Sequence, residues 1–476
     1  MQCDLQFIRR ALPDAVVSGD VPSDLSFSID SRTIKPGEIF VAMPGSKVDG
    51  HTFIKDAIKR GAGGVVVEAK RSAVIDDLTA KKLLVISVEN SRAALIGLAR
   101  VWRQQFSCPV VAITGSVGKT STRLVLNNIL RAAGYEFATS EGNQNTLIGV
   151  ALTICRMRRD HDAAIFEVGV SKRGEMSAIV DLLRPTTAAI TNAGHQHMDG
   201  LGSVADIAIE KRKVFECFGA DSIGVVNGDQ VALAAIAYRH PVVKFGAKTT
   251  NQVQVRRLRM EGGHINFVMR LYKDDYTIAL DGFHGGIIYN VLAAASLAHL
   301  LDVPHDIIAK GVRERAVVPG RFEQRELANG QGIIINDTYN ASPESVKEAL
   351  AAFARLEVSS QKIVVLGDMC GLGANGPFWH RQIGRFLGKL PLVERVILVG
   401  NLVQWTQKTA PVGGCVDRVS SWHEALEILK QELVRQKAAV LVSGSRAMGL
   451  DNLVDACTAD SYTRASQKGG RRYVQQ

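Results

Sequence analysis

The sequence contains neither a long apolar run nor a signal-like beginning. No uninterrupted apolar stretch approaches the roughly 18–20 residues that a membrane-spanning helix needs. The first residues, Met-Gln-Cys-Asp-Leu-Gln, lack the basic stretch followed by an apolar stretch that marks a secretory signal. Low-complexity tracts and short internal repeats are also missing. These absences predict a cytoplasmic protein without membrane insertion.

Cysteine is sparse and scattered. The chain has 7 cysteines, an odd number, and none of them forms a Cys-x-x-Cys pair. The odd number argues against a closed set of disulfides, and the spacing argues against a structural zinc site. Both observations fit a reducing compartment.

The composition is that of a folded protein with several domains. A chain of 476 residues is expected to hold more than one domain at roughly 100–200 residues each. Hydrophobic residues make up 46% and charged residues 22%, which excludes global disorder. The net charge of +10 comes from dispersed basic residues, so it suits anionic small substrates such as nucleotides better than a nucleic acid.

Short apolar runs alternate with helical patterns in three blocks. In the second block, residues 109–114 read as a buried central strand, whereas residues 253–279 alternate finely and indicate antiparallel strands. This alternation of predicted strands and helices predicts an α/β fold with three domains. These are a small N-terminal α/β domain (1–105), a central phosphate-loop domain with a doubly wound, mostly parallel sheet (106–314), and a C-terminal Rossmann-like α/β domain (315–476).

The strongest chemical signal is an apolar strand that runs through a glycine-rich turn into a helix. Glycines let backbone N–H groups point at phosphate oxygens, and the start of the helix adds a partial positive charge. Lys119 is expected to reach the β/γ-phosphates, and the Thr120 hydroxyl can bind Mg²⁺. The predicted phosphate-binding residues are Thr114, Gly115, Ser116, Val117, Gly118, Lys119, Thr120 and Ser121.

Further polar residues follow the predicted strands. Glu167 ends one strand, and Asn192 ends another shortly before His197, so they are placed at a sheet edge where α/β proteins bind ligands. A solvated glutamate and a structural histidine are the simpler alternatives. Lys211 lies in a charged helical segment, and the pattern alone favours a solvated helix face. Asp337 suits either a ribose hydroxyl or a turn.

Together these motifs resemble the ATP-dependent Mur ligases over nearly the whole chain, in the family's order. The phosphate loop alone would indicate only a superfamily. The later series Asp337-Thr-Tyr-Asn-Ala, Gly367-Asp-Met and Gly444-Ser-Arg is similar to the branch that uses D-alanyl-D-alanine. The other matching motifs are Ser28-Ile-Asp-Ser-Arg32, Asp49-Gly-His51, Gly142-Asn-Gln-Asn145, Glu167-Val-Gly169, Thr191-Asn-Ala-Gly-His-Gln-His197, Lys211, Pro319-Gly-Arg-Phe-Glu323 and His380.

The resemblance implies an ADP-forming amide ligase of peptidoglycan precursor synthesis that acts as a monomer. ATP would phosphorylate the terminal carboxylate of a UDP-N-acetylmuramoyl-tripeptide, and the amine of D-alanyl-D-alanine would attack the acyl phosphate. Lys119 would hold the transferring phosphate. Two Mg²⁺ ions would be held by Thr120, Glu167, His197 and a carbamate on Lys211.

The resemblance also implies substrate contacts in each domain. Asn290 would approach the adenine, Arg321 the phosphates and Asp337 the ribose. The remaining implied contacts are Ser31 and Arg32 for the uridine end, Asn143 and Asn145 for the diphosphate, and Tyr339, Asn340, Ser445 and Arg446 for the amino substrate.

Four departures from the family pattern leave alternatives open. They are Thr146, the longer stretch 284–290, Gly371 in place of a common glutamate, and Ser443 in place of a common lysine. The last two lie in the predicted C-terminal domain, so a Mur-type ligase with another amine substrate is an alternative. A non-catalytic ATP-binding relative is a second alternative, against which the retained set of charged residues argues.

Overall fold

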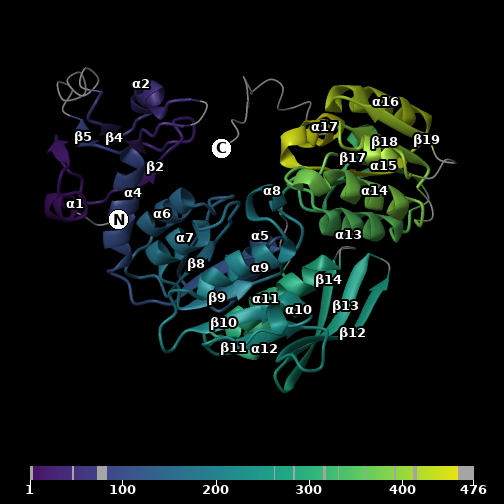
Figure 1. The fold of residues 1–476 in the computed structure, drawn as a ribbon, viewed down its shortest axis with the longest axis horizontal. Helices are drawn as coiled ribbons and strands as arrows, with labels where there is room; N and C mark the ends of the chain where they lie inside the picture. The colour runs from purple at the N-terminus through teal and green to yellow at the C-terminus, as the bar shows by residue number, and fades with distance from the viewer. Residues whose placement is uncertain are drawn as a thin grey trace.

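The computed structural model describes residues 4–45, 48–71, 83–261, 263–281, 285–314, 318–330, 332–358, 360–390, 393–410 and 415–458. Within these ranges the strands form three sheets that follow one another along the chain, as predicted. In Figure 1 the N-terminal part (purple) and the C-terminal part (green to yellow) lie above the central part (teal), on opposite sides. None of the described helices combines the length and apolar character needed to span a bilayer.

The N-terminal sheet is small and mostly parallel. Its strand order is β1-β5-β4-β3-β2, and only the β1–β5 pair is antiparallel. All residues of β4 and β5 are buried, because helices cover the sheet. The elements are α1 (Leu5–Ala11), β1 (Val16–Ser18), β2 (Phe27–Ser28), β3 (Ile39–Val41), η1 (Gly50–Phe53), α2 (Ile54–Lys59), β4 (Gly64–Glu68), β5 (Leu84–Val88) and α4 (Ser91–Arg103).

The central sheet has the order β14-β13-β12-β11-β10-β9-β6-β8-β7. Strands β6 to β12 pair in parallel, whereas β12, β13 and β14 form the antiparallel extension that the fine alternation predicted. The strands are β6 (Val110–Thr114), β7 (Phe137–Thr139), β8 (Ala163–Glu167), β9 (Thr187–Ile190), β10 (Ile223–Asn227), β11 (Val242–Gly246), β12 (Val253–Glu261), β13 (His264–Leu271) and β14 (Asp274–Asp281). The helices are α5 (Lys119–Ala132), α6 (Leu147–Cys155), α7 (Glu175–Leu183), α8 (Met198–Leu201), α9 (Val204–Arg212), η2 (Lys213–Phe215), α10 (Val231–Ala234), α11 (Gly286–His299) and α12 (His305–Val312).

Two apolar cores enclose the central sheet. Helices α5, α11 and α12 share one core with alternate strand residues such as Val111 and Ile113. Helices α6 and α7 share the other with Val110 and Ala112, and this core continues into α4 of the N-terminal part. Because both faces are covered, β6 and β8 are apolar at nearly every position, as expected for buried parallel strands.

The C-terminal sheet has the order β15-β16-β20-β17-β18-β19, in which only β15 is antiparallel to its neighbour. Helices α13 and α14 share one core with it, and α16 and α17 share the other. The elements are β15 (Glu323–Glu326), η3 (Ala328–Gly330), β16 (Gly332–Asp337), α13 (Pro343–Ala354), β17 (Gln361–Gly367), η4 (Gly373–Asn375), α14 (Gly376–Leu387), β18 (Arg395–Val399), α15 (Gln404–Gln407), β19 (Cys415–Val419), α16 (Trp422–Arg435), β20 (Ala438–Ser443), η5 (Arg446–Met448) and α17 (Leu450–Cys457).

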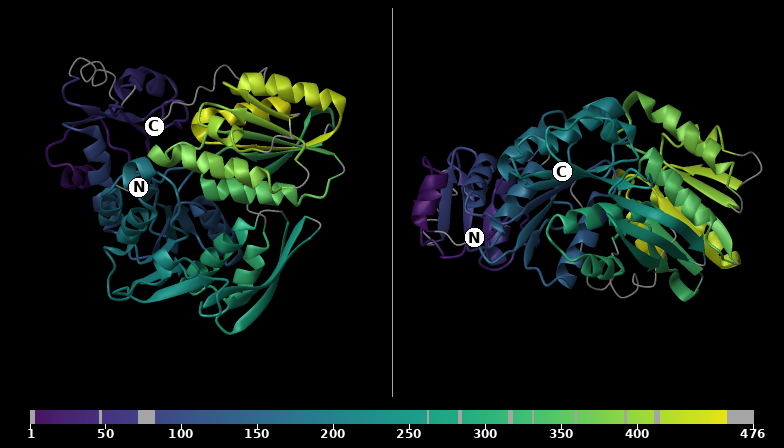
Figure 2. Two further views of the ribbon diagram at one scale, coloured as in Figure 1. Left: turned by 45° about the vertical axis from the view of Figure 1, so that its right-hand side comes forward. Right: turned by 90° about the horizontal axis from the view of Figure 1, so that it is seen from below.

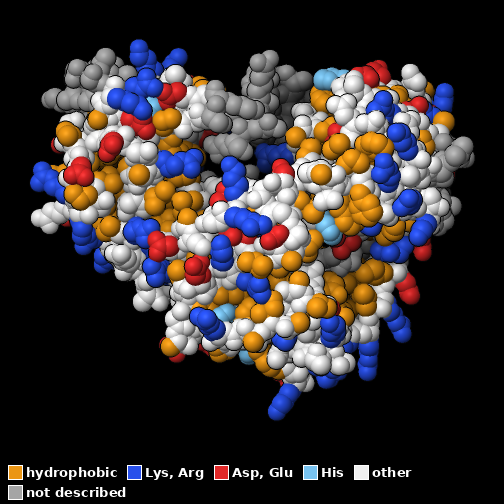
Figure 3. Space-filling model, in the orientation of Figure 1, with side chains coloured by type: hydrophobic (Ala, Val, Ile, Leu, Met, Phe, Trp, Pro, Cys, Tyr) orange, Lys and Arg blue, Asp and Glu red, His pale blue; other side chains and the backbone are white. Residues whose placement is uncertain are grey.

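The predicted α/β class with three domains is confirmed, whereas the boundaries near residues 105 and 315 stay predictions. Figure 2 shows the central part lying between the two outer parts. Lys and Arg side chains are spread over the face in Figure 3, in agreement with the dispersed basic residues of the sequence. The last sixteen residues, 461–476, are polar and basic, which predicts a frayed end, and they lie outside the described residues.

Candidate active site

The phosphate loop lies between β6 and α5, and two of its glycines are required by close approaches. Gly115 and Gly118 have φ angles of 152° and 89°, a region that favours glycine. A Cβ atom on Gly115 would lie 1.9 Å from Thr191 Oγ1, and one on Gly118 would lie 2.1 Å from Asn290 Oδ1. The glycine spacing recognised in the sequence therefore has a steric reason.

Lys119 begins α5 and folds back over the loop. Its Nζ donates to the carbonyl oxygens of Gly115 at 2.8 Å and Ser116 at 3.4 Å. Burial lowers the pKa of Lys119 to about 8, although the neighbouring Glu167 carboxylate favours the charged form. The ammonium group thus lies beside the backbone that is expected to hold phosphate.

Glu167 ends β8 and is only 1% exposed, so the alternative of a solvated glutamate is wrong. Its Oε1 accepts from Asn145 Nδ2 at 2.9 Å, and its Oε2 lies 3.6 Å from Arg123 Nε. Among the described residues, Glu167 Oε2 and Thr120 Oγ1 are buried and accept or donate no hydrogen bond. Buried oxygens without a hydrogen-bond partner fit Mg²⁺, which prefers hard oxygen ligands.

The prediction of a solvated helix face at Lys211 is wrong. Lys211, on α9, is 2% exposed because α9 packs into the interior beside the site. Burial lowers its pKa well below the usual value, and the charge of Lys119 acts in the same direction. His197 precedes α8 in a left-handed conformation with a φ of 53°, and burial, Lys119 and Lys211 lower its pKa. Lys119, His197 and Lys211 are therefore close together.

A cavity of about 760 Å³ extends from the phosphate loop to the C-terminal sheet. Asn290, Arg321, Asp337 and Asn340 all line it, so the structure brings these predicted residues together. Burial raises the pKa of Asp337 to about 6, although its carboxylate accepts hydrogen bonds. One donor is the Ser443 hydroxyl at 3.2 Å. Ser443, which stands where the family commonly has a lysine, therefore lies beside Asp337.

The residues predicted for the amino substrate gather at the same end of the C-terminal sheet. The guanidinium groups of Arg321 and Arg446 lie 4.3 and 5.7 Å from the ring centre of Tyr339. The Ser445 hydroxyl accepts from the Cys370 N–H at 2.8 Å. The next residue, Gly371, accepts from Met198 N–H at 2.9 Å, so the site lies against the central domain.

The predicted uridine residues belong to a separate part of the molecule. Ser31 is buried just after β2, and Arg32 is held by Asp30 through Nη2 at 2.6 Å and Nε at 2.9 Å. Asn143 lies in the loop before α6, where its carbonyl accepts from the Asn145 N–H at 2.7 Å.

Two features of the site were missed in the sequence. Arg123 is one helical turn after Lys119 on α5, and this i, i+4 spacing could have placed it beside the phosphate loop. The contact between His195 and Glu344 was missed because its partners lie in different domains. Nothing local in the sequence connects them.

The chain belongs to the Mur ligase family. Three family models match it: "Mur ligase family, catalytic domain" over residues 26–103, "Mur ligase middle domain" over 113–298, and "Mur ligase, glutamate ligase domain" over 320–446.

Among individual proteins, the chain is 31% identical to UDP-N-acetylmuramoyl-tripeptide–D-alanyl-D-alanine ligase from Escherichia coli (strain K12), over 90% of this chain and 92% of that protein. A MurF ligase from Thermotoga maritima in complex with ADP is 25% identical, with a TM-score of 0.76 over 90% of this chain and 96% of that one. A MurF structure from Acinetobacter baumannii shares the fold with a TM-score of 0.80 at 24% identity, covering 95% and 97% of the two chains.

Proposed function

We propose that this chain is an ATP-dependent, ADP-forming ligase that joins D-alanyl-D-alanine to UDP-N-acetylmuramoyl-tripeptide during peptidoglycan precursor synthesis. The observation that carries the proposal is the group formed by Lys119, Glu167, His197 and Lys211 at one sheet edge. The E. coli relative that covers nearly the whole chain carries this activity in its name.

The reaction has two steps. The terminal carboxylate of the tripeptide takes the γ-phosphoryl group of ATP, which gives an acyl phosphate and ADP. The amine of D-alanyl-D-alanine then attacks the acyl carbon, and the tetrahedral intermediate loses phosphate to form the amide. Lys119 and Arg321 hold the transferring and neighbouring phosphates, so the chain contributes positioning and charge stabilisation.

Mg²⁺ and a carbamate complete the proposed site. Thr120, Glu167, His197 and a carbamylated Lys211 would hold two Mg²⁺ ions, which supply charge neutralisation at the phosphates when bound. The lowered pKa of Lys211 supports the modification, because only a neutral amine adds CO₂ and loses a proton to give the carbamate. The anion formed would lie next to Lys119, which favours it.

The substrates are divided among the three domains. The N-terminal domain (1–105) binds the uridine nucleotide, the central domain (106–314) binds ATP, and the C-terminal domain (315–476) binds the dipeptide. The proposed contacts are Ser31 and Arg32 for uridine, Asn143 and Asn145 for the diphosphate, residues 114–121 for the ATP phosphates, Asn290 for adenine, Asp337 for ribose, and Tyr339, Asn340, Ser445 and Arg446 for the dipeptide.

The test is mass spectrometry of the products formed from UDP-muramoyl peptides, ATP-Mg and a panel of amines. We expect one amide per ADP with the tripeptide and D-alanyl-D-alanine. Preference for a single amino acid would assign the chain to another amide ligase of the family. ATP binding without any amide product would favour the non-catalytic alternative.

A further inference from the structure

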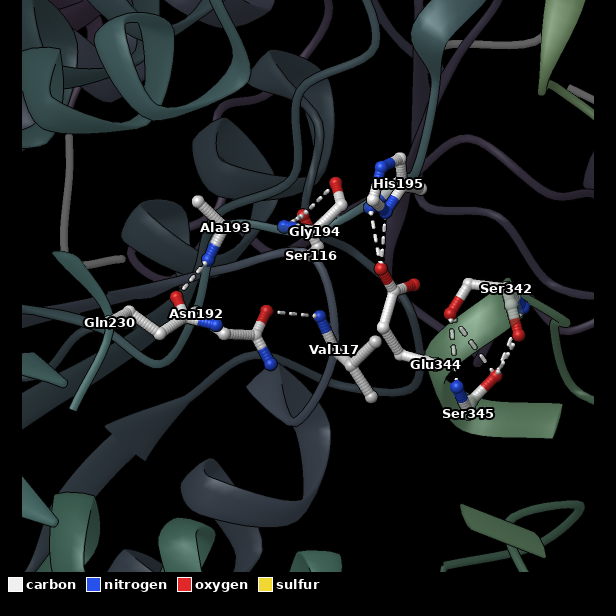
Figure 4. A network of polar contacts seen from close by, with 10 residues as sticks. All are labelled: Ser116, Val117, Asn192, Ala193, Gly194, His195, Gln230, Ser342, Glu344 and Ser345. Atoms are coloured by element: carbon white, nitrogen blue, oxygen red, sulfur yellow. Dashed lines mark hydrogen bonds and ion pairs between the residues drawn. The ribbon is translucent and has the colours of Figure 1, made fainter. Parts of the chain in front are cut away.

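Residues 191–197, which connect β9 to α8, touch both the phosphate loop and the C-terminal domain (Figure 4). We call this segment the bridging loop. It also carries His197, so its conformation affects the proposed metal site. One set of contacts lies within the central domain, and the other crosses to α13 and α14.

On the central side, the bridging loop holds the backbone of the phosphate loop. The N–H of Ser116 donates to the carbonyl of Asn192 at 3.1 Å, and the N–H of Val117 donates to Asn192 Oδ1 at 2.8 Å. The Ser116 hydroxyl donates to the carbonyl of Gly194 at 3.1 Å and accepts from its N–H at 3.0 Å. The direction of the phosphate-loop amides therefore depends on residues 192–194.

On the side of the C-terminal domain, one carboxylate contacts the bridging loop. Glu344 Oε1 lies 2.5 Å from His195 Nδ1 and accepts from the His195 backbone N–H at 3.3 Å. The His195 ring also packs on Trp379 of α14, with 4.2 Å between ring centres. Glu344 is in the first turn of α13, where the helix dipole stabilises a negative charge.

We propose that His195 and Glu344 are positioning residues that couple docking of the C-terminal domain to the shape of the phosphate loop. In the docked state Glu344 fixes His195, and residues 192–194 then keep the amides of Ser116 and Val117 in their observed directions. Separation of the domains removes this support without breaking any bond inside the phosphate loop. Nucleotide binding and domain docking consequently favour each other, as linkage requires.

This inference rests on the proposed ATP-dependent function, and its test reads the phosphate loop directly. Amide hydrogen exchange of peptides covering residues 114–121 is measured by mass spectrometry, with and without ATP-Mg. We expect Glu344→Ala to speed exchange at the loop and to raise the KM for ATP about fivefold, the factor expected for loss of one partly buried hydrogen bond. The variant Glu344→Gln keeps an acceptor oxygen, so it should restore both values.

The matched control is His305→Ala. His305 Nδ1 lies 2.8 Å from Asp274 Oδ2, a similar pair that lies entirely within the central domain. We expect it to leave the phosphate-loop exchange and the KM for ATP unchanged. The double variant His195→Ala/Glu344→Ala should have a smaller effect than the sum of the two single variants, because both substitutions break the same contact.

Two results would overturn the coupling. One is a folded Glu344→Ala enzyme with wild-type exchange at residues 114–121 and a wild-type KM for ATP. The other is faster exchange throughout the chain together with a lower melting temperature. This result would show that the contact between His195 and Glu344 only stabilises the fold. If the wild-type chain forms no amide although ATP protects its phosphate loop, the proposed function fails, and the exchange data still decide the coupling.

Discussion

The central and C-terminal sheets are both mostly parallel and covered by helices on both faces, but the polar groups at the ends of their strands differ. At the central edge, burial lowers the pKa of both His197 and Lys211, and the charge of Lys119 lowers both further. At the C-terminal edge, the Asp368 carboxylate accepts from two backbone N–H groups at 3.0 and 2.8 Å, and His380 Nε2 accepts from the Met369 N–H at 3.2 Å.

This difference indicates which sheet edge favours a charged ligand. The buried charge of Lys119 gains most from an incoming anion, so the central edge suits a phosphate ligand. Polar groups that are already hydrogen-bonded gain little from a ligand, and they hold the C-terminal edge in one shape. The following substitutions test each half of this comparison.

The largest effect is expected for Lys119→Ala. Removing one preorganised charge from the transferring phosphate should lower kcat on the order of 10²–10³-fold. The matched control is Lys362→Ala, since Lys362 is also buried but donates to the carbonyl of Ala354 at 2.8 Å in the C-terminal domain. This control should lower the denaturation midpoint and leave kcat unchanged. ADP release near the wild-type rate from folded Lys119→Ala would refute the central half of the comparison.

Lys211→Ala should lower kcat on the order of 100-fold, because it removes the proposed carbamate from the metal site. Small carboxylates such as acetate should restore part of the activity, and intact-mass measurements under CO₂ should show one added CO₂ on the wild type. The neighbouring Lys213→Ala serves as control, because Lys213 pairs with Glu210 at 2.8 Å and is partly exposed. Full activity of Lys211→Ala without any carboxylate would contradict the assignment.

His380 should make the C-terminal domain less stable in acid. Burial lowers its pKa from 6.5 to about 4, so the folded state binds fewer protons than the unfolded state between these values. Its stabilising contribution is complete above the unfolded pKa and is lost as the pH falls toward 4. We expect a loss of about 2 kcal/mol between pH 7 and pH 5.

Urea denaturation at both pH values measures this contribution. His380→Gln should show a smaller change in midpoint between them than the wild type does, because glutamine does not titrate. An equal change in both proteins would show that other groups cause the acid sensitivity.

The smallest effect is expected for Ser443→Ala. Losing the hydrogen bond from its hydroxyl to Asp337 should cost about 1 kcal/mol of unfolding free energy and raise the pKa of Asp337 further. Ser443→Thr keeps the hydroxyl and should stay near the wild type in urea denaturation. A cost of several kcal/mol would mean that the C-terminal edge depends on a single contact, contrary to the comparison.

Much of the fold could be predicted because its signals are local. The apolar run at residues 109–114 predicted a buried central strand, and β6 occupies Val110–Thr114. The glycine spacing around Lys119 predicted the turn into α5, which sterics at Gly115 and Gly118 explain. The charge pattern around Lys211 led to the wrong prediction of a solvated helix face. A charged helical segment can have the same sequence whether it faces solvent or a buried site.

The α/β class, the order of the three domains and the phosphate loop could be predicted from the sequence alone, because they depend on periodicity and short-range backbone sterics. The three-dimensional packing determines which polar groups are buried and which residues distant in sequence are in contact. The burial of Lys211, the place of Arg123 beside Glu167 and the contact of His195 with Glu344 depend on packing between elements far apart in the chain. Desolvation and charge proximity arise from that packing, so no local pattern encodes them.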